Sequence, residues 1–398
     1  MFAATAVRQA VAHKHIGCLR ALKRFGYIWR VSRKRSSVEI AWFAALCDDD
    51  YEFLGVPDED LQSSWSHCGE IVRRAEANGF DNVLLPSGYS LGIDATAFTA
   101  AVATQTKQIR LLLALRLGEL VVPQLARQVA TLQQISNSRL VINAISSEMP
   151  GEQLSSESRY RRTTEYLYAL GELLEGRAIN LDGEFLQINI EPPRIVKPSM
   201  GCPPIYFGGL SEAARDCAAA SADVYLMWPD TTAKVSSVIF DLQLRAQQFG
   251  RSLSYGWRSH VIVRETEREA REAARRLLSR LDPVVGDAIR AKSLDATSTG
   301  VSRQSELRSS ADDDGYIEQN LWTGVGRARS GAGIAIVGDP DQVAAKLHEL
   351  ADAGVSTFIL SGYPHLKECD LFAKYVLPQI NHSPLSLSHT QVALHEQN

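Results

Sequence analysis

From residue 38 onward, short runs rich in Val, Ile and Leu alternate with longer amphipathic stretches, a pattern typical of repeated βα units. We predict eight strands: Val38–Ala45, Asn82–Pro86, Arg110–Arg116, Arg139–Ser146, Pro204–Gly209, Asp223–Trp228, Gly256–Arg264 and Thr357–Gly362. Helix candidates follow them, for example Gln124–Ile135, Ser158–Glu175, Glu267–Leu281 and Lys367–Leu377. Eight βα units in one parallel sheet close most naturally into a TIM barrel, whose catalytic groups lie at the carboxyl ends of the strands.

Two segments interrupt this regularity. Ile179–Ile190 contains Asp182-Gly183 between alternating apolar residues, which predicts a β-hairpin after the fourth helix. Asp282–Gly333 includes the Ser-, Asp- and Gly-rich stretch Ser298–Gly315, and a connection of this length indicates a lid or a disordered loop.

The last predicted helix before the eighth strand has clear start signals. Asp339 is suited to cap a helix that runs through Ala353, and Pro340 is suited to its first turn. We expect one barrel domain over residues 38–380 and a loose tail over residues 381–398.

Charge divides the chain into a basic head and an acidic body. The chain has net charge −4, but residues 1–37 hold nine Lys or Arg and no Asp or Glu, which leaves about −13 on the rest. The head could be an extension outside the fold, a transit peptide or a nucleic-acid-binding arm. The negative body argues against nucleic-acid binding by the domain itself.

Composition limits the class further. The 398 residues are 45% hydrophobic, which excludes a disordered or fibrous chain, and the richest apolar run, Leu111–Leu115, is too short to span a bilayer. The cysteines have no paired spacing, so we expect a reducing, cytoplasmic compartment; they are Cys18, Cys47, Cys68, Cys202, Cys217 and Cys369.

The seventh strand carries two polar residues that could serve a pocket. Arg258 and His260 lie two residues apart and therefore project to one face, which we expect to be the barrel interior. They could form an inward ion pair or a satisfied core histidine, or they could bind an anionic ligand.

The exit of the eighth strand carries a phenol and an imidazole. In Ser361-Gly362-Tyr363-Pro364-His365, the tyrosine could donate to a developing oxyanion and the histidine could shuttle a proton. The alternative is a tyrosine packed under a proline-containing turn.

Two glycine-rich segments could approach a ligand. Leu321–Gly333 includes Arg327 and Arg329 but lacks the third glycine of a dinucleotide fingerprint. Phe207-Gly208-Gly209-Leu210-Ser211 leads from a strand into a helix and is either an anion site or an ordinary βα turn.

The sequence has no motif for zinc or Walker-type phosphate binding, and we assign no metal. The acidic clusters Asp48–Asp50 and Asp312–Asp314 are interpreted as solvated loop charge.

Together these segments resemble the bacterial-luciferase-like flavin monooxygenases, and most closely the reduced-FMN-dependent alkanesulfonate monooxygenases. The resemblance runs from about Val38 to Leu377 and is carried by Tyr206–Gly209, Arg258–Thr266, Asn320–Asp339 and Leu360–Leu366. It implies oxidative cleavage of a C–S bond with reduced FMN and dioxygen, which releases sulfite and an aldehyde. It also implies a separate NAD(P)H-dependent flavin reductase as partner, and leads us to expect a homo-oligomer.

Position by position, the resemblance assigns roles to individual residues. It implies a flavin and substrate pocket lined by Arg258, His260, Tyr363 and His365, with Arg329 on a closing lid. Trp228 matches an active-site tryptophan. The FMN contacts implied are Asn143, Ser146, Tyr160, Gly209 and Ser211.

The chain also departs from that family's pattern. Cys47 replaces a histidine after the first strand, Leu91 replaces a cysteine after the second in a segment with one extra residue, and Pro57 and Asp58 replace a glutamate region. The substrate could therefore differ from a simple alkanesulfonate. Two alternatives stay open: another luciferase-like flavin- or deazaflavin-dependent oxidoreductase, and a non-catalytic flavin-binding paralogue.

Overall fold

The computed structural model describes residues 37–88, 92–149, 151–291, 298–387 and 389–394. Almost all of the basic head, together with Cys18 and Leu91, lies outside these residues. None of the described helices is both long and apolar enough to cross a membrane.

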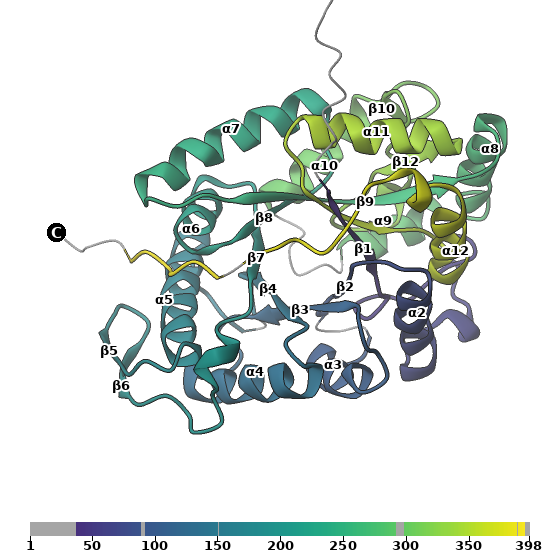
Figure 1. Cartoon of the computed structure of the whole chain (residues 1–398). Coiled ribbons are helices and arrows are strands. Elements are labelled where there is room, and N and C mark those ends of the chain that lie inside the picture. The colour runs from purple at the N-terminus through teal and green to yellow at the C-terminus, as the bar shows by residue number, and fades with distance from the viewer. Residues whose placement is uncertain (1–36, 89–91, 150, 292–297, 388, 395–398) are drawn as a thin grey trace, which may run out of the picture. The chain divides into compact units, whose positions relative to one another are not determined.

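Eight parallel strands close into a barrel, as the sequence pattern predicts (Figure 1). The ring closes because the long seventh barrel strand pairs with both the sixth and the eighth. In order around the barrel, the strands are β1 (Glu39–Phe43), β2 (Asn82–Leu85), β3 (Arg110–Arg116), β4 (Leu140–Ile145), β7 (Ile205–Gly208), β8 (Val224–Met227), β9 (Ser254–Val263) and β13 (Thr357–Ser361).

Helices follow the strands and cover the outside of the barrel (Figure 1). They are α2 (Trp65–Ala77), α3 (Ala95–Ala103), α4 (Val122–Ser136), α5 (Ser156–Leu174), α6 (Glu212–Ser221), α7 (Thr232–Gln248), α8 (Glu267–Leu277), α11 (Pro340–Asp352) and α12 (His365–Tyr375). The Asp339 side chain accepts from the backbone N–H of Gln342, and the Gln342 side chain accepts from the backbone N–H of Asp339, which is a capping box. The predicted start of this helix is therefore confirmed.

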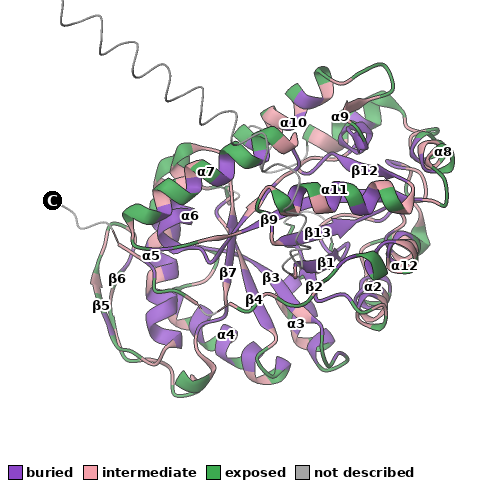
Figure 2. Cartoon of the chain, turned by 45° about the horizontal axis from the view of Figure 1, so that its top comes forward, coloured by how far each residue is buried: buried purple, intermediate pink, exposed green. Residues whose placement is uncertain are grey.

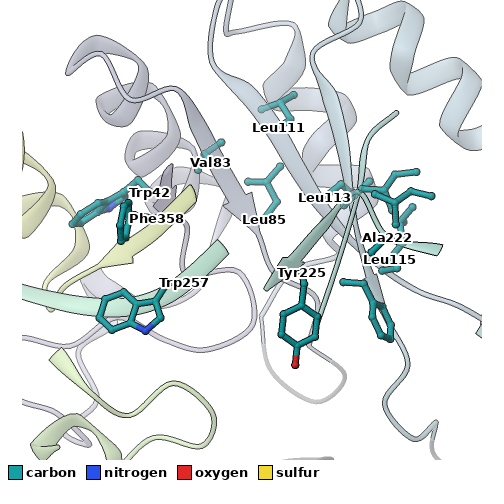
Figure 3. Close-up of a cluster of buried hydrophobic side chains, with 14 of the residues drawn as sticks. Trp42, Val83, Leu85, Leu111, Leu113, Leu115, Ala222, Tyr225, Trp257 and Phe358 are labelled. Atoms are coloured by element: carbon teal, nitrogen blue, oxygen red, sulfur yellow. The ribbon is translucent and has the colours of Figure 1, made fainter. Parts of the chain in front are cut away.

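The main apolar core lies between the strands and these helices. Figure 3 shows Trp42, Val83, Leu85, Leu111 and Leu113 among its side chains, and all five are fully buried. Because side chains alternate along a strand, the neighbouring positions point into the barrel. The interior is filled by a second cluster: Ala41, Phe43, Leu84, Leu112, Val141, Tyr206, Val224 and Ile359.

The predicted hairpin is confirmed as β5 (Ile179–Asp182) and β6 (Gln187–Ile190), which pair antiparallel. Its turn is fixed by Glu165 of α5, whose carboxylate accepts the backbone N–H groups of Glu184, Phe185 and Leu186 at 2.9 Å.

The segment before the eighth barrel strand is more structured than predicted. Ser298–Gly315, interpreted as a loop or lid, consists mostly of α10 (Thr299–Ser309). The surrounding elements are α9 (Pro283–Ala291), β10 (Tyr316–Glu318), β11 (Leu321–Trp322), the short helix η3 (Gly324–Arg327) and β12 (Ala335–Gly338). β12 pairs with the outer half of β9, so this segment is joined to the barrel by a strand ladder.

The described residues after His382 are not loose, so the expectation of a loose tail is wrong for them. Leu385 and Leu387 pack against the interior cluster, and Val392 is buried. The backbone N–H of Ala393 donates to the carbonyl of Ala220 in α6 at 2.9 Å. Figure 1 shows this yellow segment crossing the barrel toward α5 and α6. Residues 382–387 and 389–394 are therefore a strap across the fold, called the tail strap below.

Exposed residues lie mainly on the outer faces of the helices and on the β5–β6 hairpin, while the eight barrel strands are almost entirely buried (Figure 2). Buried polar residues occur at both ends of the barrel. At its carboxyl end they include Arg258 and His260 on β9, Asp50 after β1 and His365 after β13.

Candidate active site

β9 places Arg258 and His260 inside the barrel. Both are buried, and the Arg258 guanidinium lies 4.3 Å from the centre of the Phe43 ring, a member of the interior cluster. Arg258 donates to the hydroxyl of Ser361 on the neighbouring strand at 2.8 Å. Among the described residues it forms no ion pair, so the alternative of an inward ion pair does not describe it.

His260 is held at both ring nitrogens. Its Nε2 lies 3.1 Å from the carbonyl oxygen of Ala332, which can only accept, so Nε2 carries the proton. Its Nδ1 lies 2.8 Å from the Ser361 hydroxyl and therefore accepts from it. Arg258, Ser361, His260 and Ala332 thus form one hydrogen-bonded chain, which joins β9 and β13 to the segment before β12.

Arg329 reaches the same interior ring from the segment before β12. Its guanidinium lies 5.3 Å from the centre of Phe43, so one aromatic ring lies beside two cations. Arg329 donates to the hydroxyl of Tyr363 at 2.7 Å, and the nearest oxygen of Asp48 is 3.6 Å away. Only 11% of its side chain is exposed. By contrast, Arg327 in the same segment is exposed, so the structure separates these two arginines.

The two guanidiniums perturb each other and their neighbours. Burial, and then repulsion from Arg329, lower the pKa of Arg258 to about 9. Burial opposes the charged form of Arg329 as well, but interactions with Tyr363, Cys47 and Asp48 outweigh it and raise its pKa. Burial and the two arginines lower the pKa of His260 well below its usual value, so this imidazole is neutral. The site therefore combines the two arginines with two carboxylates, Asp48 facing Arg329 and Asp50 bonded to His365.

Tyr363 and His365 lie where the chain leaves β13. The Tyr363 ring stacks on His260 with centroids 5.2 Å apart, and its edge meets His365 at 5.1 Å. Burial raises the pKa of Tyr363 despite the opposing effect of Arg329, so the phenol keeps its proton. The alternative of a tyrosine that is only packed under a turn is therefore incomplete, because its hydroxyl accepts a hydrogen bond from Arg329.

Asp50 is the main site residue that the sequence did not reveal. The cluster Asp48–Asp50 was interpreted as solvated charge, but Asp50 is fully buried and binds His67 and His365. Asp48 is also mostly buried, and it faces Arg329. A run of three acids resembles a surface loop, and no local signal distinguishes it.

Trp228 and the positions at which the chain departs from the family pattern lie in different surroundings. Burial raises the pKa of Cys47 although Arg329 lowers it, so its thiol is protonated. Trp228, after β8, packs against Gly300 and Gly331, since a Cβ on Gly300 would lie 2.7 Å from its indole. Of the other replaced positions, Pro57 is exposed and Asp58 caps the short helix η1 (Glu59–Leu61).

The five residues expected to contact FMN gather on β4, α5, β7 and α6. Asn143 is on β4, directly beside Tyr206 of β7 in the register. Ser146 follows β4 and accepts from Thr163 of α5 at 2.8 Å. Ser211 caps α6, with its hydroxyl accepting from the N–H of Ala214.

Gly209 makes the turn between β7 and α6 with φ of +150°, a conformation that favours glycine. A Cβ here would lie 2.6 Å from the Cβ of Ala214 and 3.2 Å from the hydroxyl of Tyr160. The turn therefore brings the Tyr160 hydroxyl and the amino end of α6 together. The ordinary βα turn and the anion site are both compatible with this geometry.

The structure thus forms two groups at the barrel's carboxyl end. The cationic group comes from β1, β9, β13 and the segment before β12, whereas the neutral group comes from β4, β7 and their helices. In the strand order, β2 and β3 separate them on one side and β8 on the other. Trp228, after β8, lies at this second boundary.

The sequence profile of luciferase-like monooxygenases matches residues 53–357. The chain is 60% identical over 356 residues to a sulfoquinovose monooxygenase of Novosphingobium aromaticivorans, covering 88% of this chain and 98% of that protein. It is 45% identical to a sulfoquinovose monooxygenase of Agrobacterium fabrum, covering 89% and 93%. The fold is similar to that of a riboflavin lyase crystallised with modified FMN and riboflavin, with a TM-score of 0.70, 16% identity and coverage of 86% and 91%.

Proposed function

The chain belongs to the luciferase-like monooxygenase family, and from this premise we propose that it uses reduced FMN and dioxygen to cleave the C–S bond of an organosulfonate. The observation that carries the proposal is the pair of arginines beside Phe43, because Arg258 is buried with no ion pair among the described residues and Arg329 is only 11% exposed. A sulfonate is a fixed anion with three acceptor oxygens, and guanidinium groups match such anions well.

The substrate we favour is a sulfonated sugar. Two relatives at 60% and 45% identity are sulfoquinovose monooxygenases. The replacements at Cys47 and around Pro57 are consistent with a substrate other than a simple alkanesulfonate. Asp48 supports the same reading, because a carboxylate beside Arg329 can accept hydrogen bonds from sugar hydroxyls while the arginines hold the sulfonate.

The neutral group at β4 and β7 fits FMN. The amino end of α6 and the adjacent Tyr160 hydroxyl suit a phosphate, and Asn143 and Ser146 offer polar groups beside them. None of these five side chains carries a negative charge. When bound, reduced FMN supplies two electrons that let dioxygen place one oxygen atom on the sulfonate-bearing carbon, the other leaving as water, so that sulfite and an aldehyde are released.

The chain's own residues bind, orient and enclose the reactants. Arg258 and Arg329 hold the sulfonate, the protonated Tyr363 donates a hydrogen bond, and His365 exchanges a proton. α10 and the segment before β12 exclude water from the barrel mouth. We also propose a separate flavin reductase as the source of reduced FMN, and a homo-oligomeric assembly.

The test is aerobic turnover with reduced FMN on a panel of sulfonates, including sulfoquinovose and simple alkanesulfonates, with sulfite release as readout. Sulfite from sulfoquinovose, and much less from alkanesulfonates, supports the proposal. Anaerobic titration with reduced FMN, NADPH and a reduced deazaflavin gives the cofactor. Tight binding of the deazaflavin or NADPH without FMN binding would contradict FMN as the cofactor. FMN binding without turnover of any sulfonate would favour a non-catalytic paralogue.

A pH dependence follows from Arg258. Its pKa lies near 9, so the guanidinium is charged below this pH and loses its proton above it. We expect kcat/KM for the sulfonate to be constant between pH 7 and 8 and to fall up to tenfold per pH unit above about pH 9. Steady-state sulfite release from pH 7 to 10.5 measures this, and a flat profile up to pH 10.5 would contradict it.

A further inference from the structure

The Asp50 carboxylate is bonded to both the ring and the backbone of His365. Resting on the proposed function, we propose that Asp50 is a positioning residue that fixes the tautomer of His365, so that Nε2 is the nitrogen that exchanges a proton during turnover.

The Asp50 carboxylate accepts twice from His365. Oδ1 lies 2.8 Å from the Nδ1 of the ring, and Oδ2 lies 2.8 Å from the backbone N–H of the same residue. Two contacts to one residue fix both its position and the rotation of its ring. The two residues are 315 positions apart in the chain, so the pairing joins the exit of β1 to the start of α12.

The carboxylate is ionised in this position. Burial alone raises its pKa, but His365 and the hydrogen bonds of His67 and the backbone outweigh burial and hold the pKa of Asp50 below its usual range. An ionised carboxylate can only accept, so the Nδ1 of His365 carries a proton. In the neutral ring, Nε2 is then unprotonated and able to act as a base.

The Nε2 of His365 is buried and has no hydrogen-bond partner among the described residues. His365 is 1% exposed, and an orphaned nitrogen at such a site calls for an explanation. The His365 ring lies against Tyr363 and Phe43, at centroid distances of 5.1 and 5.9 Å. Phe43 and Tyr363 also contact the arginines, so the His365 ring lies beside the cationic group.

His260 does not offer the same chemistry, because both of its nitrogens are engaged. The charged and titratable groups near His365 are Asp50, His67, Tyr363, His260, Arg258 and Arg329. Glu368, on the same helix as His365, accepts from Arg264. Of these, only Asp50 is hydrogen-bonded to the His365 ring, so the positioning role falls to it.

The experiment is a double-mutant cycle on the full chain. Asp50→Asn keeps the shape but turns an amide N–H toward a position that needs an acceptor, which favours the wrong tautomer. We expect kcat to fall about tenfold while KM and the FMN dissociation constant change less than twofold. In a His365→Gln background, Asp50→Asn should cause no further loss of kcat, because Asp50 acts through His365. A further loss in that background, or unchanged kcat in the single variant, overturns the proposal.

The matched control is His382→Gln, which changes a histidine–aspartate pair at the amino ends of the strands, away from the candidate site, and should change kcat less than twofold. If Asp50→Asn does not fold, the wild-type protein still decides. With ¹⁵N-labelled histidine, the resonances lost in His365→Gln identify this ring. A proton on Nδ1 supports the proposal, whereas an unprotonated Nδ1 overturns it. Failure of the proposed function differs from both results, since wild-type protein would then release no sulfite.

Discussion

Replacing Arg329 with alanine is expected to lower kcat/KM for the sulfonate at least tenfold. Its side chain is only 11% exposed, lies beside Phe43 and donates to Tyr363, so in the proposed reaction its charge would meet the sulfonate with little water to screen it. A charge-assisted contact of this kind is worth about 1.5–3 kcal/mol, and 1.4 kcal/mol corresponds to a factor of ten. Steady-state sulfite release over a range of substrate concentrations measures the loss.

Two further variants give the prediction its controls. Arg329→Lys should recover only part of the activity, because it keeps the charge but not the planar fork of donors. Arg327→Ala removes an exposed arginine two residues away and should leave kcat/KM within twofold. Equal losses in Arg327→Ala and Arg329→Ala would mean that the segment, rather than the Arg329 contact, carries the effect.

The burial of Arg329 also changes what we expect for stability. A mobile lid would make its replacement neutral, but here the change leaves the Tyr363 hydroxyl and Asp48 without their partner. We therefore expect the free energy of unfolding to fall by about 1–3 kcal/mol. If Arg329→Ala lost much more stability than this, its lower kcat/KM could reflect unfolded protein rather than the missing substrate contact. Arg329→Lys is measured beside it for this reason.

The barrel and the inward position of Arg258 and His260 could be predicted from local pattern, whereas the place of Arg329 in the site was implied by the family resemblance. Eight apolar runs separated by amphipathic stretches indicate the fold, and spacing of two along β9 places Arg258 and His260 on one face. The register then brings them beside the exit of β13, where His260 stands opposite Ser361. Strand periodicity and the common edge of a parallel sheet were sufficient for this much.

The sequence did not reveal what depends on contacts between distant residues. Asp50 belongs to an acidic run that would suit a loop, and its burial depends on His365, far along the chain. α10 was missed because Ser, Asp and Gly dominate its surroundings, yet Ser298 caps it and its side chains bind the β8 exit. Arg303 of this helix pairs with Asp230, and Gln304 donates to the carbonyl of Pro229 at 2.7 Å.

The tail strap illustrates the same limit, since polar residues such as His382 and His389 give no local sign of packing. Three carboxylates lie at the amino ends of strands, and each accepts from the strap. Asp81, before β2, binds His382 at 3.0 Å; Glu39, at the start of β1, binds the N–H of Leu385 at 3.3 Å; Asp223, before β8, binds the N–H of Thr390 at 2.9 Å.

Removing residues 382–398 is therefore expected to lower the free energy of unfolding by at least about 4 kcal/mol. Each buried apolar side chain lost costs about 1.5–3 kcal/mol, and each buried polar group left without a partner costs about 1–3 kcal/mol. Val392 is 4% exposed, and Leu385 and Leu387 pack against the interior cluster. Equilibrium unfolding in urea, followed by circular dichroism, measures the change.

Two point variants test whether the tail strap stabilises the protein through its packing against the barrel rather than through its presence alone. Leu387→Asp places a charge against the apolar interior cluster and should destabilise the protein by several kcal/mol, whereas Ser386→Asp adds the same charge at an exposed neighbour and should have little effect. The candidate active site lies at the opposite, carboxyl end of the strands, so we expect kcat of the folded Leu387→Asp protein to stay within twofold of wild type. Equal stabilities of the two aspartate variants would refute the packing of the strap, because Leu387 packs against the interior cluster whereas Ser386 is exposed.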